Sequence, residues 1–150
     1  MENGASDIAR LVHDCYWRHD INCAGTTLRV LSILHAFPLE GQVLEAATGM
    51  HGAGGFGAQC GLMEGALMFL GCYCASRGEP APHTADICRA YAGAFTAEFG
   101  SLTCAVLRPG GFRDDDPPHL CEALTVNSIA FTHTYIISFL QDTEQAPKRA

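Results

Sequence analysis

Hydrophobic side chains recur every three to four residues through most of this chain, which is the period of an amphipathic helix. No stretch shows the strict alternation that is typical of a β-strand. We therefore predict an all-α fold, a compact helical bundle of about five or six helices that forms a single domain over residues 1–150. The predicted helices cover about residues 6–19, 23–37, 42–48, 59–76, 85–99 and 118–141.

Residues that favour helix ends support these boundaries. Ser6 or Asp7 can cap the first helix, Asn22 the second and Thr84 the helix at 85–99. Gly100 is a natural helix stop, since glycine tolerates the left-handed backbone found there. The tail after residue 142 is predicted to fray.

A glycine-rich segment, Gly49–Gly57, leads into Cys60 and the helix predicted at 59–76. That helix is apolar on nearly every side, which indicates a central position in the bundle. The glycines permit backbone angles closed to other residues, so this loop can set the direction in which Cys60 enters the helix.

Charge and hydropathy exclude two classes of partner. Nine basic residues against sixteen acidic ones give a formal net charge of -7, which repels phosphate backbones and anionic lipid head groups. The most apolar stretch, residues 61–75, is shorter than the roughly 20 residues of a membrane span and contains Glu64. We expect no nucleic-acid partner and no association with a membrane.

The chain contains eight cysteines. Its first residues, Met1–Asp7, lack the basic and apolar pattern of a secretory signal, so we expect a cytoplasmic protein. In a reducing compartment, metal binding or thiol chemistry explains several of these cysteines better than a disulfide scaffold does.

Helical geometry separates the cysteines. Cys72 and Cys74 are two residues apart on one helix, about 200° around its axis, so they cannot both face one site. Cys15 and Cys88 lie on apolar stripes and suit core packing. Cys60 begins a helix, where free backbone N–H groups favour a thiolate, although it could equally be an inert small hydrophobe. The four cysteines near predicted helix ends or loops are Cys23, Cys60, Cys104 and Cys121.

Glu64 follows Cys60 by one helical turn and is the only charged residue of its helix core. It could accept a proton beside Cys60, or form a salt bridge with an arginine such as Arg29 or Arg89.

Three histidines are further candidates. His51 could replace a cysteine as a metal ligand, because it lies in the glycine-rich segment. His119 and His133 belong to the last predicted helix, and a surface or structural role is favoured for each histidine.

Several segments together resemble the C_GCAxxG_C_C family, whose members are described as putative redox-active proteins. The strongest resemblance is the stretch Cys-Gly-Leu-Met-Glu-Gly-Ala-Leu-Met-Phe-Leu-Gly at 60–71, preceded by the glycines. The segments Asn22–Ala24 and Phe99–Cys104, followed by Cys121, support it. The resemblance covers the chain from about Asn22 to Phe139.

That family is helical and is similar to the non-haem domain of split-Soret cytochromes, which are dimeric and hold an iron-sulfur cluster. The resemblance implies a homodimer and a redox or cluster-binding set formed by Cys23, Cys60, Cys104 and Cys121. No Cys-x-x-Cys-His motif is present, so c-type haem is not expected.

The leading hypothesis is a redox protein that binds an iron-sulfur cluster through three or four of these cysteines and transfers electrons to or from a redox partner protein. One alternative is a thiol-disulfide enzyme in which Cys60 is the reactive thiolate. A second alternative is a structural or sensory zinc-binding module, because zinc also selects soft thiolate ligands. The sequence leaves open which metal is bound and whether the protein is an enzyme.

Overall fold

The computed structural model describes the backbone of residues 2–145 and the side chains of residues 6–139. The described chain is helical and compact, as predicted, and its only β-type pairing is an isolated bridge between Gln59 and Thr103. The α-helices are α1 (Glu2–His13), α2 (Cys23–Leu34), α3 (Gly41–Ala46), α4 (Gly52–Gly55), α5 (Gly61–Ser76), α6 (Ala81–Phe99), α7 (Cys104–Leu107) and α8 (Glu122–Gln145). A π-helical turn, η1 (Asp14–Arg18), continues α1, and a 3-10 turn, η2 (Ala47–Gly49), follows α3.

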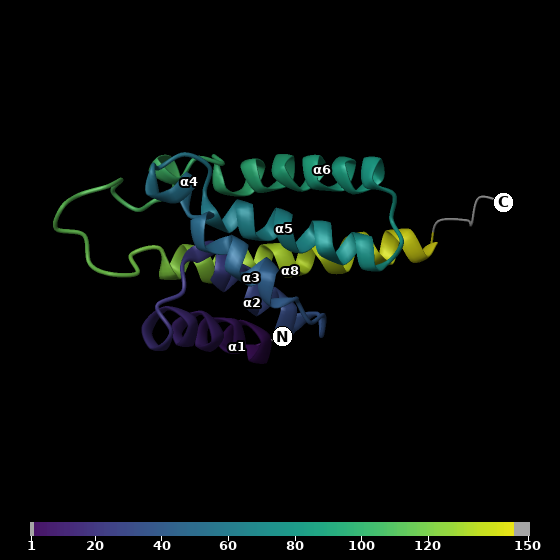
Figure 1. The fold of residues 1–150 in the computed structure, drawn as a ribbon, viewed down its shortest axis with the longest axis horizontal. Helices are drawn as coiled ribbons and strands as arrows, with labels where there is room; N and C mark the ends of the chain where they lie inside the picture. Colours follow the sequence, from purple (N-terminus) through teal and green to yellow (C-terminus); the bar gives the residue numbers. More distant parts are fainter. Residues whose placement is uncertain (1, 146–150) are drawn as a thin grey trace.

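The central position predicted for the apolar helix is confirmed. Helix α5 packs most extensively against α2, and it also contacts α6 and α8. Helix α1 packs against α8. Figure 1 shows α1 and α6 on opposite sides of the bundle. The short helices α4 and α7 lie at one end of the bundle, where the loop between α7 and α8 also extends (Figure 1).

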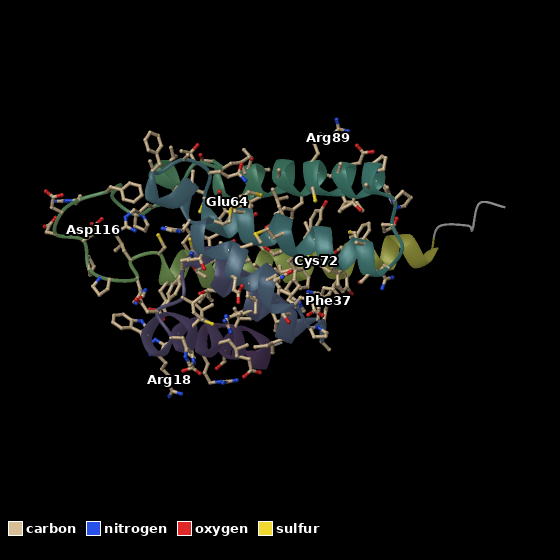
Figure 2. The ribbon with its side chains drawn as sticks, viewed as in Figure 1. Arg18, Phe37, Glu64, Cys72, Arg89 and Asp116 are labelled. Carbon is tan, nitrogen blue, oxygen red and sulfur yellow. The ribbon has the colours of Figure 1, made fainter. Side chains whose placement is uncertain are left out.

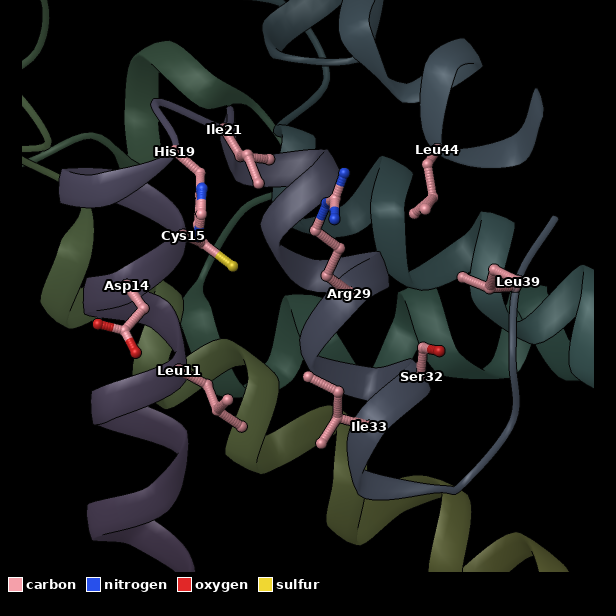
Figure 3. A pocket seen from close by; sticks show the side chains of 10 residues that line it. All are labelled: Leu11, Asp14, Cys15, His19, Ile21, Arg29, Ser32, Ile33, Leu39 and Leu44. Atoms are coloured by element: carbon pink, nitrogen blue, oxygen red, sulfur yellow. The ribbon is translucent and has the colours of Figure 1, made fainter. Parts of the chain in front are cut away.

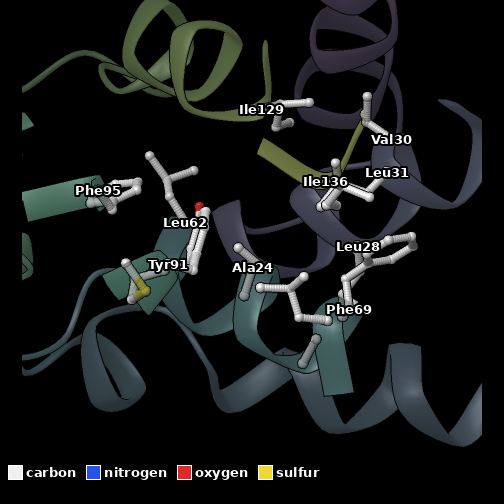
Figure 4. Close-up of a cluster of buried hydrophobic side chains, with 14 of the residues drawn as sticks. Ala24, Leu28, Val30, Leu31, Leu62, Phe69, Tyr91, Phe95, Ile129 and Ile136 are labelled. Atoms are coloured by element: carbon white, nitrogen blue, oxygen red, sulfur yellow. The ribbon is translucent and has the colours of Figure 1, made fainter. Parts of the chain in front are cut away.

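The core is built from the apolar faces of the long helices around the central α5, since packing these faces together removes them from water. Figure 4 shows side chains of α2, α5, α6 and α8 meeting in this core. Its largest fully buried members include Leu28, Leu31, Leu62, Phe69, Tyr91, Phe95, Ile129 and Ile136.

Two buried tyrosines connect distant helices to α8 through hydrogen bonds. The Tyr91 hydroxyl lies 2.7 Å from Thr132 Oγ1, and the Tyr16 hydroxyl lies 2.7 Å from Thr125 Oγ1. Each phenolic group is buried, so these bonds satisfy polar atoms that would otherwise be costly to remove from water. They join α6 and η1 to the same face of α8.

Two of the predicted end signals are confirmed. The Asn22 side chain accepts a hydrogen bond from the Gly25 amide at 2.8 Å and thereby caps α2. Gly100 ends α6 with a left-handed backbone, at a φ of 84°. Both signals act through groups within four residues, which is why local sequence was sufficient to find them.

Other boundaries differ from the predictions. Helix α1 begins at Glu2, so Ser6 and Asp7 lie inside it and are not its caps. Helix α6 begins at Ala81 rather than near residue 85, because Pro80 and Pro82 initiate the helix, where their missing N–H groups are tolerated. Thr84 is therefore an internal residue of α6.

The last helix was predicted to begin at Pro118, and α8 begins at Glu122 instead. The intervening His119 has a φ of 57°, a left-handed conformation that cannot continue a right-handed helix. Fraying was predicted after residue 142, but α8 continues to Gln145. Residues 146–150 lie outside the described part of the chain. No described helix is both long enough and apolar enough to cross a lipid bilayer.

Candidate functional site

Cys60 and Cys104 are held side by side by backbone pairing between two loops. The Cys60 amide donates to the Leu102 carbonyl at 2.8 Å, and the Cys104 amide donates to the Ala58 carbonyl at 2.6 Å. These bonds flank the bridge between residues 59 and 103. Residues that are 44 positions apart in the sequence are thereby brought together at the start of α5 and of α7.

Cys23 joins this end of the bundle from α2, where it is the first helical residue. Its sulfur packs so closely against Gly61 that a Cβ atom on residue 61 would overlap it. The preceding Asn22 stabilises the junction, since its Nδ2 donates to the carbonyls of Ala47 and Thr48 at 3.0 and 2.9 Å. Cys23 thus places its sulfur at the junction between α2 and the start of α5.

The glycine-rich loop leaves room for Cys104. Gly52 has a φ of +69°, and a Cβ atom added there would lie 3.2 Å from Cys104 Sγ. Gly52 satisfies two conditions at once, because only glycine adopts that backbone readily and only glycine lacks the interfering carbon.

Cys121 lies in the turn just before α8, and Arg108 reaches it from the other side of the intervening loop. Arg108 Nη1 is 3.9 Å from Cys121 Sγ. The same guanidinium forms a largely buried ion pair with Asp116, at 2.9 Å, and stacks over Phe112 at 4.9 Å. Sequence analysis missed Arg108, since nothing in its local pattern distinguishes it from a solvated loop arginine.

Three of the four predicted cysteines line one pocket of about 310 Å³, namely Cys23, Cys104 and Cys121. Cys60 is buried, with 4% of its surface exposed, and its sulfur is close enough to hydrogen-bond with Cys104. Four separate segments of the chain thus contribute a thiol to one end of the bundle. The remaining pocket walls include Tyr16, Asn22, His51, Arg108, Phe112 and His119.

A model of the family described as "Putative redox-active protein (C_GCAxxG_C_C)" matches residues 21–135. The chain belongs to this family. All four cysteines of the pocket region lie within the matched residues. Searches of curated proteins and of solved structures found no significant match. The resemblance of residues 22–139 described above is therefore confirmed at the level of the family.

Burial is the largest cause that raises the pKa of each thiol at this site. Burial is the main cause that raises the pKa of Cys23 to about 12, and the neighbouring Cys60, Cys104 and Cys121 raise it further. The pKa values of Cys104 and Cys121 are also raised by burial, while the positive charge of Arg108 lowers both. Four thiolates at this site would repel one another in a poorly hydrated environment.

The prediction that the helix start favours a thiolate at Cys60 is wrong. As predicted, amides of the first turn of α5, those of Leu62 and Met63, lower its pKa. Burial outweighs them, however, and raises the pKa of Cys60 to about 11. A reactive thiolate requires both exposure and a low pKa, and the burial and raised pKa of Cys60 run opposite to both.

Glu64 forms no salt bridge with Arg29 or Arg89. Arg89 pairs instead with Asp86 at 3.0 Å on the outer side of α6, well away from Glu64 (Figure 2). The Glu64 carboxylate faces the glycine-rich loop, where the amides of Gly52 and Ala53 lower its pKa against a larger rise caused by burial. One of its oxygens, Oε2, is buried without a hydrogen-bond partner among the described residues.

Two of the three candidate histidines lie at the cysteine site. His51 and His119 line the cysteine pocket, and the His119 ring stacks on Tyr16 with centroids 4.9 Å apart. His133 lies elsewhere, where its Nδ1 is 3.1 Å from His35 Nε2. His133 is therefore separate from the candidate site.

Cys15 and Cys88 pack against the core, as predicted, and Cys74 lies within it. Cys74 is fully buried, and Cys15 and Cys88 are half-buried against the core cluster. Cys72 is half-buried on α5, toward the end of the bundle opposite α4 (Figure 2). No three His, Cys, Asp or Glu side chains of the described residues surround a common point closely enough to be metal ligands as they stand.

Proposed function

We propose that this protein is an electron-transfer protein that holds an iron-sulfur cluster through Cys23, Cys60, Cys104 and Cys121. The observation that carries the proposal is the gathering of four thiols from four segments at one largely buried site. Bringing together thiols from distant segments gives no stabilisation by itself, whereas a centre of soft metal ions requires several thiolate ligands at one place.

The electrostatics of the site support a cationic occupant. Burial raises the pKa of all four thiols, and neighbouring cysteines raise it further for Cys23, Cys60 and Cys104, so ionisation of the set is unfavourable without a compensating positive charge. Iron or zinc ions supply that charge and displace the thiol protons on binding. Thiol donors fit both metals and do not fit Mg²⁺ or Ca²⁺.

The chain itself performs three tasks in this proposal. Asn22 and the paired loops at Cys60 and Cys104 fix the direction of the donors. Burial excludes water, and the guanidinium of Arg108 lowers the cost of negative charge at Cys121. A bound cluster would supply the capacity to accept and release one electron.

Anaerobic purification followed by metal and sulfide analysis and a visible spectrum tests the proposal. We expect iron and acid-labile sulfide in similar amounts and a broad brown absorption. Zinc without iron would replace the proposal by the zinc-binding module, and a metal-free protein with titratable thiols would replace it by thiol chemistry. The high pKa and burial of Cys60 count against Cys60 as the nucleophile of such an enzyme.

A further inference from the structure

A second hollow lies between η1, α2 and α3, on a different face of α2 from the core. It has a volume of about 390 Å³, which is within the about 300–1,000 Å³ of typical small-molecule sites. Its walls are mostly apolar, and Figure 3 shows them surrounding the side chain of Arg29. The apolar lining residues are Leu11, Ile21, Ile33, Leu39 and Leu44, together with Cys15.

Arg29 differs from the other arginines whose side chains are described. None of the ion pairs formed by the described side chains involves Arg29. The other arginines each pair with a carboxylate or stack on an aromatic ring, namely Arg10, Arg18, Arg77, Arg89, Arg108 and Arg113. Arg29 thus presents an uncompensated guanidinium to the hollow.

The one acidic group of this hollow is already engaged. Asp14 Oδ1 lies 3.2 Å from Arg18, and its other oxygen lies 3.9 Å from Arg10. Figure 3 shows the Asp14 carboxylate on the far side of the hollow from the Arg29 guanidinium, which extends between Ile21 and Leu44. A local positive charge therefore persists on a chain whose net charge is -7.

The guanidinium is reached from two hollows. A neighbouring one of about 340 Å³ shares Ile21, Arg29 and Leu44 with the first, and it shares Asn22 and His51 with the cysteine pocket. This neighbouring hollow at Arg29 thus borders residues that also line the cysteine pocket, among them Asp20.

We propose that this hollow binds a small organic acid, with its anionic group on Arg29 and an apolar body against Leu39 and Leu44. The guanidinium forms paired hydrogen bonds with a carboxylate, and the aliphatic walls bury the hydrocarbon. The inference is independent of the cofactor proposed for the cysteines.

The probe is sodium octanoate, titrated by isothermal calorimetry into the full-length protein, with octylamine and inorganic phosphate as matched comparisons. We expect saturable binding of octanoate at one site, with at least tenfold weaker binding of octylamine, which lacks the anion, and of phosphate, which lacks the apolar body. Equal binding of octanoate and octylamine, tight binding of phosphate alone, or no binding of octanoate would overturn the proposal.

Substitutions locate the site. Arg29→Gln should weaken octanoate binding at least tenfold, Arg29→Lys should restore part of it, and Arg89→Gln, on the opposite side of the bundle, should leave it unchanged. Arg29 is exposed, so its replacement should not unfold the protein, and far-ultraviolet circular dichroism checks this. Leu44→Glu, which places a carboxylate in the hollow, should also abolish binding. Unchanged affinity in Arg29→Gln would refute the assignment.

Discussion

Gly61, the first residue of α5, lies so close to the sulfur of Cys23 that a Cβ atom at residue 61 would overlap it. The same added carbon would approach the Met50 carbonyl oxygen to 2.7 Å. The absence of a side chain at residue 61 therefore allows α2, α5 and the glycine-rich loop to meet at the cysteine site. This contact leads to the first prediction.

Gly61→Ala should destabilise the protein by about 1–3 kcal/mol, since overpacking a rigid contact forces the backbone apart. Gly71→Ala is the matched control on the same helix, because a Cβ atom there meets nothing within 4 Å. It should instead stabilise the protein by about 0.5–1 kcal/mol through helix propensity. Urea denaturation measures both effects, and equal stability of the two variants would contradict the contact.

Asn22→Ala should cost about 2 kcal/mol, because it removes the cap of α2 and two bonds to the carbonyls of Ala47 and Thr48. Asn22→Asp keeps the capping oxygen but replaces the donor with a second acceptor. It should therefore recover only part of the loss. Thermal denaturation gives the order of stability, and full recovery in the aspartate variant would exclude the role of Nδ2.

The cysteines should divide into two functional classes. Replacing any of Cys23, Cys60, Cys104 or Cys121 with serine should abolish or sharply weaken metal binding, since a hydroxyl is a poor ligand for soft metals. We expect the replacement of Cys60 to cause the largest loss of metal. The other class consists of Cys15, Cys72, Cys74 and Cys88. Replacing any of these with alanine should leave the metal in place and lower the free energy of unfolding by on the order of 1 kcal/mol where the side chain is buried. Iron content per chain decides the matter, and metal loss that followed Cys72 and Cys74 alone would disprove the assignment.

The pair His35 and His133 should make stability depend on pH. Burial, and next the nearby His133, lowers the pKa of His35 to about 4, and burial also lowers that of His133. In the unfolded chain both pKa values are about 6.5, so the unfolded state binds more protons between about pH 6.5 and 4. Stability should therefore fall as the pH decreases through this window.

Denaturation midpoints at pH 7.5 and 4.5 test this prediction in the wild type and in a variant with His35→Gln and His133→Gln. The double variant should lose less stability on acidification than the wild type. His83→Gln is the control, because His83 is an exposed histidine paired with Glu79. Parallel losses in the wild type and the double variant would remove these histidines as the cause.

Exposed apolar side chains at the cysteine end predict a homodimer. Phe56 is 89% exposed, Val106 69% and Phe112 55%, and Phe112 lies against Gly57 of the glycine-rich loop. Large exposed apolar side chains that lie at the same end of a protein are typical of protein interfaces. Light scattering should give twice the 16.0 kDa of one chain, and Phe56→Ser with Val106→Ser should shift it toward the monomer. A monomer at every concentration would reject the dimer.

Much of the secondary structure, and the list of candidate cysteines, follow from the sequence alone. The helical period, the Asn22 cap and the Gly100 stop depend on interactions within a few residues, so local patterns contain them. The family resemblance also identified Cys60 and its glycine-rich approach. Both helices extended past their predicted caps: α1 begins at Glu2, before Ser6, and Pro80 and Pro82 start α6 before Thr84.

Tertiary structure alone decided how these residues act together. The bridge between residues 59 and 103 places Cys60 beside Cys104, and the loop before α8 brings Arg108 to Cys121. Burial raises the pKa of Cys60 in spite of its helix start, and the glycine-rich loop packed beside α5 gives Glu64 backbone amides as partners instead of an arginine. These outcomes depend on desolvation and on contacts between segments far apart in the chain, quantities that no local pattern of residues contains.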